Sequence, residues 1–199
     1  HWVSPLAQHV YLSLGCRFQR GIAAMAGLSL AVGVLVAEAL RGYGLTQVGL
    51  KWPNDLLLGP CKLGGILLES RGSAHGPALA VIGIGLNVHH AAVAATAIDQ
   101  PWTSIDQHRP ELTQRDGVVA AVLNVLLPGL AGFERDGLAP FVERFAALDV
   151  LAGQDIWIHQ HGQCHPATAL GLAADGGLRV LDQHGERCLH AGDVSVRKQ

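Results

Sequence analysis

The chain has 199 residues and a mass of 20.9 kDa, with 14 Lys and Arg, 16 Asp and Glu and a formal net charge of −2. Hydrophobic residues make up 49% and charged residues 15%, which favours one folded core, or a larger and a smaller domain, over disorder. Nucleic-acid binding needs a Lys/Arg stripe to neutralise phosphates, and the sequence contains none. The four cysteines form no CxxC pair, so we expect a reducing cytoplasm and no disulfide framework.

Two apolar segments, residues 21–37 and 117–133, contain no charged side chain. Each is short for a membrane span, rich in Ala and Gly, and flanked by charged residues, so we expect buried core helices and no membrane partner. The chain also begins with His1 in place of Met. We therefore expect that sequence upstream of it is missing.

Residues 10–14 predict a strand, and residues 20–43 predict a long helix that Gly42 and Gly44 end. Short apolar runs separated by Pro-Asn and Gly-Pro breaks then predict the strands of a meander. These runs are residues 48–52, 55–58 and 62–69. Residues 78–88 predict a further strand, apolar enough to be buried on both faces.

Residues 89–102 show no clean period, which predicts a mobile loop. Helical patterns follow at residues 112–135, kinked or broken near Pro128, and at residues 138–148. From Asp149 onward the pattern changes to short strands separated by Gly turns. This change predicts a small β-barrel appended to the main domain.

Lysine is rare in this chain, which has 11 arginines but only Lys51, Lys62 and Lys198. Two of the three lie in the stretch KWPNDLLLGPCKLGGILLE, where Pro53 ends a strand and presents Asn54 and Asp55. Asp offers a hard oxygen ligand for Mg²⁺, and Asn offers a neutral donor and acceptor. Pro-Asn-Asp is also ordinary turn chemistry, so a structural role remains an alternative.

Lys62 opens a predicted strand that continues with Gly64 and Gly65. Gly inside a strand often marks close approach by a ligand or by another backbone. A Lys ammonium is a compact charge that can lie between two anions, whereas the Arg fork prefers one bidentate partner. The pattern favours a charge-bridging role for Lys62, with a solvated surface lysine as the alternative.

The motif GIGLN places Gly83 and Gly85 on one face of a strand that ends at Asn87. A clear helix does not follow it, which disfavours a dinucleotide fingerprint. Two interpretations stay open: tight sheet packing, or a second strand end that faces the same anion site as Asp55.

Together, KWPND, KLGGILLE and GIGLN, in this order and spacing, resemble the biotin–protein ligases (biotin–[acetyl-CoA-carboxylase] ligases). Residues 2–14 look like the strand after the family's biotinyl-adenylate loop, and residues 176–197 resemble its C-terminal SH3-like domain. The resemblance covers essentially the whole chain. It implies an α+β fold, with a mixed sheet and packed helices of the class II synthetase-like biotin/lipoate ligase type over residues 1–148 (the ligase catalytic domain), followed by a small SH3-like β-barrel over residues 149–199.

The resemblance also implies an ATP-dependent ligase that forms biotinyl-5′-AMP and transfers biotin to a lysine of a biotin carboxyl carrier protein. Lys62 would be the catalytic cation between the biotin carboxylate and the α-phosphate, and Gly65 would let biotin approach the backbone. Residues implied in binding ATP and Mg²⁺ are Lys51, Asn54, Asp55 (Mg²⁺ through ATP), Asn87 and Trp102, the last covering the adenine.

The family's Gly/Arg-rich biotin loop and ureido-binding residues lie upstream of the segment that matches Trp2 and are absent here. We therefore expect half a site, inactive alone, and the alternative is a non-catalytic fragment that binds nucleotide or carrier. The family's winged helix-turn-helix is also absent, so we expect no nucleic-acid binding by this chain. A lipoate–protein ligase is a further alternative, disfavoured by KWPND and the SH3-like tail. A homodimer through sheet edges is possible for this family.

The stretch HQHGQCH, residues 159–165, contains three His and one Cys. Alternate residues of a hairpin point to opposite faces, so these side chains cannot all converge on one ion. We interpret this cluster as incidental turn composition, and His89 and His90 as ordinary loop residues.

Overall fold

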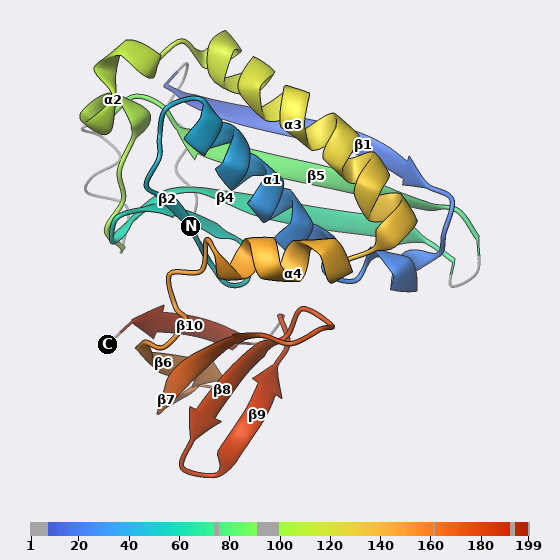
Figure 1. Cartoon of the computed structure of the whole chain (residues 1–199), viewed down its shortest axis with the longest axis vertical. Coiled ribbons are helices and arrows are strands. Elements are labelled where there is room, and N and C mark those ends of the chain that lie inside the picture. The colour runs from blue at the N-terminus through green and yellow to red at the C-terminus, as the bar shows by residue number, and fades with distance from the viewer. Residues whose placement is uncertain (1–7, 74–75, 91–99, 161, 192–193, 199) are drawn as a thin grey trace.

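The computed structural model describes residues 8–73, 76–90, 100–160, 162–191 and 194–198. It contains two five-stranded sheets, the first with helices packed on one face and the second beside it (Figure 1). The first sheet has the order β1 (His9–Phe18), β5 (Ala78–Asn87), β4 (Cys61–Gly72), β3 (Asp55–Leu58) and β2 (Val48–Lys51). The second has the order β10 (Val194–Lys198), β6 (Asp155–Gln160), β7 (Gln163–Leu172), β8 (Leu178–Asp182) and β9 (Gly185–Leu189).

The strands predicted in the first half of the chain are confirmed, but the predicted mixed sheet is wrong. Every pair of neighbouring strands in the first sheet is antiparallel. Short turns connect β2 to β3 and β3 to β4, and such turns can join only antiparallel neighbours. Among the described residues, parallel pairing occurs only as isolated bridges, at Leu50–Asp149 and Lys62–Trp102.

The long predicted helix is confirmed from residue 28 onward as α1 (Leu28–Gly42), preceded by a 3₁₀ turn, η1 (Ile22–Met25). Two segments, Ile22–Gly42 and Arg115–Asp136, have the length and hydropathy that a membrane span needs. In the structure α1 packs against β2 and β4 and contacts α3 (Arg115–Asp136) and α4 (Ala139–Ala146). Between α2 (Ile105–His108) and α3 lies a second 3₁₀ turn, η2 (Pro110–Leu112).

The helix α3 is continuous through Pro128, so a break there is wrong, while the alternative of a kink stays a prediction. It buries a single stripe of side chains: Val118, Val122, Leu126, Leu130 and Phe133. Pro128 and Asn124 lie on the opposite, exposed side. Proline removes the hydrogen bond to the carbonyl four residues earlier, and here water can satisfy that carbonyl without a break in the helix.

Helices cover only one face of the first sheet (Figure 1), and we call the other its open face. The prediction that β5 is buried on both faces is therefore wrong. Its residues alternate between buried and accessible, and Leu79 and Val81 on the open face are 56% and 46% exposed. Apolar composition alone cannot distinguish a strand covered on both faces from one covered on a single face.

The second sheet is antiparallel throughout, which confirms the predicted run of short strands after Asp149. Its buried residues join the same hydrophobic core as α1 and the first sheet. Backbone hydrogen bonds of Leu50 with Leu148 and Val150 fix the connection between the two sheets. Trp52 adds a buried bond, donating from Nε1 to the Gly176 carbonyl at 3.1 Å.

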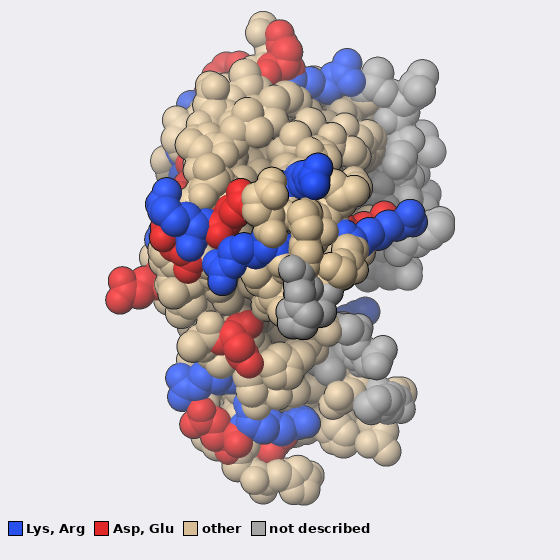
Figure 2. All heavy atoms as spheres, turned by 90° about the vertical axis from the view of Figure 1, so that its right-hand side faces the viewer, with Lys and Arg blue, Asp and Glu red and all other residues tan. Residues whose placement is uncertain are grey.

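Basic and acidic side chains are interspersed on the face drawn in Figure 2. The described residues on this face form no patch of a single sign. A duplex-binding surface needs a continuous basic stripe, so this face gives no support to nucleic-acid binding.

Candidate functional site

A cavity of about 340 Å³ opens on the open face of the first sheet. Its walls come from β1, β4 and β5 and from the start of β3. The lining residues are Tyr11, Leu12, Ser13, Asn54, Asp55, Lys62, Gly65, Ile66, Leu67, Gly83, Ile84 and Gly85.

Asp55 is the centre of the charged cluster in this cavity. Its Oδ1 lies 2.5 Å from Lys62 Nζ, and its Oδ2 lies 3.6 Å from Lys51 Nζ. The three side chains are only 15–20% exposed, so their charges are screened less than those of surface pairs. Two ammonium groups and one carboxylate leave one net positive charge, which favours an anionic ligand.

A β-bulge explains why Lys62 reaches this cavity. The register between β3 and β4 shifts at Leu56/Leu57, so Gly65 pairs with Asp55 while Lys62 pairs with Leu57. The extra residue, Leu63, is completely buried. Since a one-residue shift moves every following side chain to the other face, the bulge turns Lys62 to the same face as Gly65.

Two adjacent glycines in β4 have different neighbours. A Cβ on Gly64 would overlap the Gly85 carbonyl oxygen of β5 and approach Leu86 Cδ2 to 2.8 Å. The nearest atoms to a Cβ on Gly65 would be Lys62 Cε at 3.5 Å and atoms of Asn54 and Asp55 at 3.7 Å. Gly64 therefore serves the packing of two strands, whereas Gly65 keeps the cavity floor open beside the charged cluster.

Asn54 is held by the strand that it faces. Its Nδ2 donates to the Ile66 carbonyl at 2.9 Å, and its own carbonyl accepts from Ile66 N at 2.9 Å. Both amide protons belong to Nδ2, so Oδ1 can still accept from or bind to a ligand. Together with the carboxylate of Asp55, this oxygen is the kind of donor that Mg²⁺ prefers, although two lysines already share the Asp55 carboxylate.

Asn87 and Trp102 lie beside Lys62, the second residue of β4, and do not line the cavity. Asn87 is 8% exposed and donates from Nδ2 to the Thr103 carbonyl at 3.0 Å. Lys62 N donates to the Pro101 carbonyl, and Thr103 N donates to the Lys62 carbonyl, each at 2.9 Å. Asn87 thus holds the segment that contains Trp102 against Lys62.

The Trp102 ring stacks on His90, with centroids 4.7 Å apart and planes at 11°. Behind it, His9 is buried and its Nδ1 has no hydrogen-bond partner. Burial and the neighbouring His89 lower the pKa of His9, against smaller opposing effects of the Gln8 backbone and Asp106. His90, predicted as an ordinary loop residue, therefore has a specific aromatic partner.

Four predicted residues, Asn54, Asp55, Lys62 and Gly65, meet in one cavity. Lys51 joins them through Asp55. Tyr11, Leu12 and Ser13 of β1 form a further wall of the cavity that was not predicted from the sequence. These residues of β1 lie far from the KWPND and KLGGILLE motifs in the sequence, so no motif includes them. They reach the site because β1 pairs with β5.

Some predictions concern residues that the structure does not describe or describes only in part. Residues 2–7, His161 and residues 91–99 of the predicted loop lie outside the described residues. In the HQHGQCH cluster, Cys164 Sγ lies 3.9 Å from His159 Nε2, and His165 pairs with Gln163 at 3.2 Å. These two pairs do not combine into a group of three ligands among the described residues.

The model of the biotin/lipoate A/B protein ligase family matches residues 1–87. The bifunctional ligase/repressor BirA of Escherichia coli is 39% identical over 197 residues, covering 98% of this chain and 61% of BirA. The biotin--[acetyl-CoA-carboxylase] ligase of Paracoccus denitrificans is 40% identical over 207 residues, covering 97% of this chain and 82% of that protein.

The fold is similar to the crystal structure of the biotin protein ligase from Aquifex aeolicus, with a TM-score of 0.80 and 22% identity. That likeness covers 96% of this chain and 83% of the other. A structure of the same ligase in complex with biotin and ATP gives a TM-score of 0.81. The chain spans 61% of the length of the BirA relatives from Escherichia coli and Salmonella typhimurium. Identity of 40% over most of a ligase of similar extent shows that the chain belongs to the biotin protein ligase family.

Proposed function

We propose that this chain provides the catalytic site of an ATP-dependent biotin–[acetyl-CoA-carboxylase] ligase. The observation that supports this most is the cluster of Lys62, Asp55 and Lys51 beside the open glycine floor of the cavity. Its excess positive charge suits a reaction in which two anions must meet. The named relatives act on biotin and on acetyl-CoA carboxylase, which specifies the substrates.

In the first step, a carboxylate oxygen of biotin attacks the α-phosphorus of ATP. The bond from that phosphorus to the bridging oxygen of pyrophosphate breaks, so biotinyl-5′-AMP and pyrophosphate form. Lys62 Nζ lies between the two anions and lowers their repulsion, which requires it to leave or share Asp55. A positioned cation of this kind in a dry site contributes on the order of 10²–10³ in rate.

In the second step, a lysine amine of a biotin carboxyl carrier protein attacks the acyl carbon of the mixed anhydride. An amide forms, AMP leaves and the amine loses a proton. The enzyme mainly has to hold the amine near the anhydride, which is catalysis by proximity.

The remaining assignments follow the same proposal. Gly65 lets biotin approach the backbone, while Lys51, Asn54, Asp55, Asn87 and Trp102 hold ATP, with Trp102 over the adenine. Mg²⁺ bound with ATP would neutralise phosphate charge, and the Asp55 carboxylate is the oxygen donor available to it. For Trp102 to cover the adenine, His90 must leave its stacked position or stack beyond it.

At the level of the whole molecule, we propose a catalytic domain over residues 1–148 and an SH3-like domain over residues 149–199. The antiparallel order of the second sheet supports the latter. We also propose a cytoplasmic protein that can form a homodimer and whose described part does not bind nucleic acid or membranes.

The experiment compares the chain with Lys62→Ala and Lys51→Ala variants. Calorimetry measures binding of biotin and of ATP with Mg²⁺, and pyrophosphate release measures adenylate formation. Lys51 is the matched control, because it faces the same carboxylate from 3.6 Å and is equally buried. Where the unaltered chain forms the adenylate, contrary to the inactive half site predicted from the sequence, we expect Lys62→Ala to slow this step by on the order of 10²–10³ and Lys51→Ala by less than ten-fold.

Equal losses in the two variants would refute the bridging role of Lys62. If ATP binds but the unaltered chain neither binds biotin nor releases pyrophosphate, the chain is a nucleotide-binding fragment. In that case the ligase activity would belong to a longer protein.

A further inference from the structure

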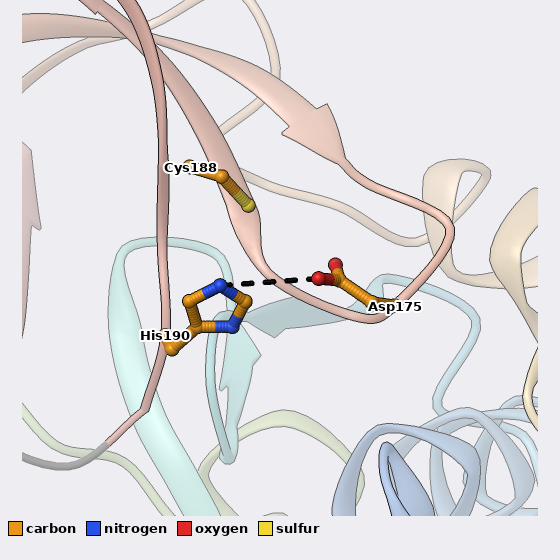
Figure 3. A group of neighbouring side chains, drawn as sticks. All are labelled: Asp175, Cys188 and His190. Carbon is orange, nitrogen blue, oxygen red and sulfur yellow. Dashed lines mark ion pairs between the residues drawn. The ribbon is translucent and has the colours of Figure 1, made fainter.

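A second cluster of possible ligands lies in the second sheet, away from the cavity. Asp175, Cys188 and His190 each offer one ligand atom, and these three atoms lie within 4.8 Å of one another. Figure 3 shows the three side chains directed toward a common space, with His190 Nε2 and Asp175 Oδ2 3.8 Å apart. We propose that these three residues form a binding site for a divalent transition cation of the zinc class.

The backbone explains why these side chains converge. Cys188 and His190 are two residues apart in and directly after β9, so they lie on the same side of the strand, while Leu189 between them is buried. Asp175 lies in the turn between β7 and β8, which pairs with β9. The site is therefore formed by secondary structure and not by one flexible loop.

Two further contacts prepare the cluster. Asp175 Oδ1 accepts a hydrogen bond from Gly177 N at 3.0 Å, which orients the carboxylate and leaves Oδ2 toward His190. A Cβ on Gly177 would overlap Cys188 Sγ and come within 3.2 Å of His190 Cε1. Because Gly177 has no side chain, the Cys188 thiol and the His190 imidazole have room beside its backbone.

The donor set and the distances both fit a zinc-class ion. Thiolate, imidazole and carboxylate bind Zn²⁺ at about 2.3, 2.0–2.1 and 2.0–2.2 Å, which places tetrahedral ligand atoms roughly 3.3–3.6 Å apart. The separations in this cluster are at most 4.8 Å, so they have to close by at most about 1.2–1.5 Å. All three side chains are exposed, so small rotations can close these separations and the fourth position is open to water.

A nucleophilic role for the same three residue types fits less well. Partial burial of the sulfur and the Asp175 carboxylate raise the pKa of the Cys188 thiol, whereas a reactive cysteine needs a lowered pKa. The negative charge of the Asp175 carboxylate disfavours a second negative charge on the Cys188 thiolate. A bound cation attracts both groups and so offsets their repulsion.

A bound cation would also stabilise the contact between the two sheets. Gly176, adjacent to Asp175, accepts the buried hydrogen bond from Trp52 Nε1. Linking Asp175 to β9 through an ion would fix the turn that holds this bond. We therefore expect the ion to raise the unfolding temperature of the chain as well as to bind.

The test titrates Zn²⁺ into the reduced full chain by calorimetry and uses Co²⁺ as a spectroscopic probe for thiolate ligation. We expect one Zn²⁺ per chain and a Co²⁺–thiolate absorption band. Cys188→Ser and His190→Ala should each weaken Zn²⁺ binding at least ten-fold and abolish the rise in unfolding temperature. Cys164→Ser is the matched control, because Cys164 is also exposed and lies 3.9 Å from a histidine, His159.

Circular dichroism and the unfolding temperature without metal show whether each variant is folded. The proposal is overturned if the unaltered chain does not bind Zn²⁺. It is also overturned if Cys188→Ser leaves binding and the Co²⁺–thiolate band unchanged, or if Cys164→Ser abolishes them.

Discussion

The adjacent glycines of β4 offer a test that separates folding from ligand binding. Gly65→Ala adds a methyl group that meets no atom closer than 3.5 Å. Contacts at that distance are ordinary packing, so we expect the free energy of unfolding to change by at most about 0.5 kcal/mol. The same methyl group protrudes into a cavity of about 340 Å³ beside Lys62 and Asp55. We expect it to weaken biotin binding at least ten-fold, which corresponds to about 1.4 kcal/mol.

Gly64→Ala is the opposite case. Its methyl group would overlap the Gly85 carbonyl oxygen, which belongs to the backbone of β5 and cannot rotate away. The two strands must separate, at a cost of about 1–3 kcal/mol for overpacking.

The assays are urea unfolding for stability and calorimetry with biotin and with ATP and Mg²⁺ for binding. We expect Gly65→Ala to lose binding while keeping its stability, and Gly64→Ala to lose stability. If the two variants have the same free energy of unfolding, the different surroundings of Gly64 and Gly65 do not affect stability as proposed. If Gly65→Ala binds both ligands normally, the cavity floor is not the ligand site.

Three further predictions concern stability. Trp52→Phe removes the donor to the buried Gly176 carbonyl, and we expect a loss of about 1–3 kcal/mol in urea unfolding. Arg144→Ala removes a bidentate pair with Glu38 whose side chains are 38% and 36% exposed, so we expect a loss of at most about 1 kcal/mol that high salt reduces. The lowered pKa of buried His9 means that the unfolded chain binds more protons below about pH 6.5, so thermal stability should fall as the pH decreases through that value, and His9→Phe should flatten the dependence.

The residues that carry local information were predictable. Pro53 and the Gly-Pro break delimit short strands, and the alternation and apolar content of the runs place β3 at its observed bounds, Asp55–Leu58. The unusual use of lysine also pointed to the site, since Lys51 and Lys62 converge on Asp55.

The failures all involve information that is not local. The short turns between β2, β3 and β4 require antiparallel neighbours, but the neighbours of β1 and β5 depend on contacts distant along the chain, so the order of the whole first sheet could not be deduced from the runs alone. The exposure of Leu79 and Val81 depends on helices that cover only one face. The bulge at Leu63 depends on the register between β3 and β4, and without it Lys62 would point to the wrong face.

Clusters along the sequence do not reveal the proposed metal site. HQHGQCH is dense in histidine and was interpreted as incidental turn composition, and its described side chains divide between two small pairs. Asp175, Cys188 and His190 are spread over sixteen residues and meet only because β8 pairs with β9. Antiparallel pairing of two strands places the residues before the first strand beside those at the end of the second. The ligands of one metal ion can therefore lie far apart in the sequence.

The motif KWPND makes contacts in two directions: its charged residues form the cluster at the cavity, and its tryptophan contacts the second sheet. Asp55 lines the cavity and pairs with Lys51, while Trp52 between them is 1% exposed and donates to the turn of the second sheet. Because Trp52 is joined covalently to Lys51 and Pro53, a movement of this second-sheet turn that displaces the Trp52 backbone also shifts theirs. Trp52 thus connects the second sheet to the charged cluster, in addition to the backbone hydrogen bonds of Leu50, and Trp52→Phe should therefore weaken ATP binding in proportion to its loss of stability. Loss of stability with unchanged ATP binding would show that these two sets of contacts act independently.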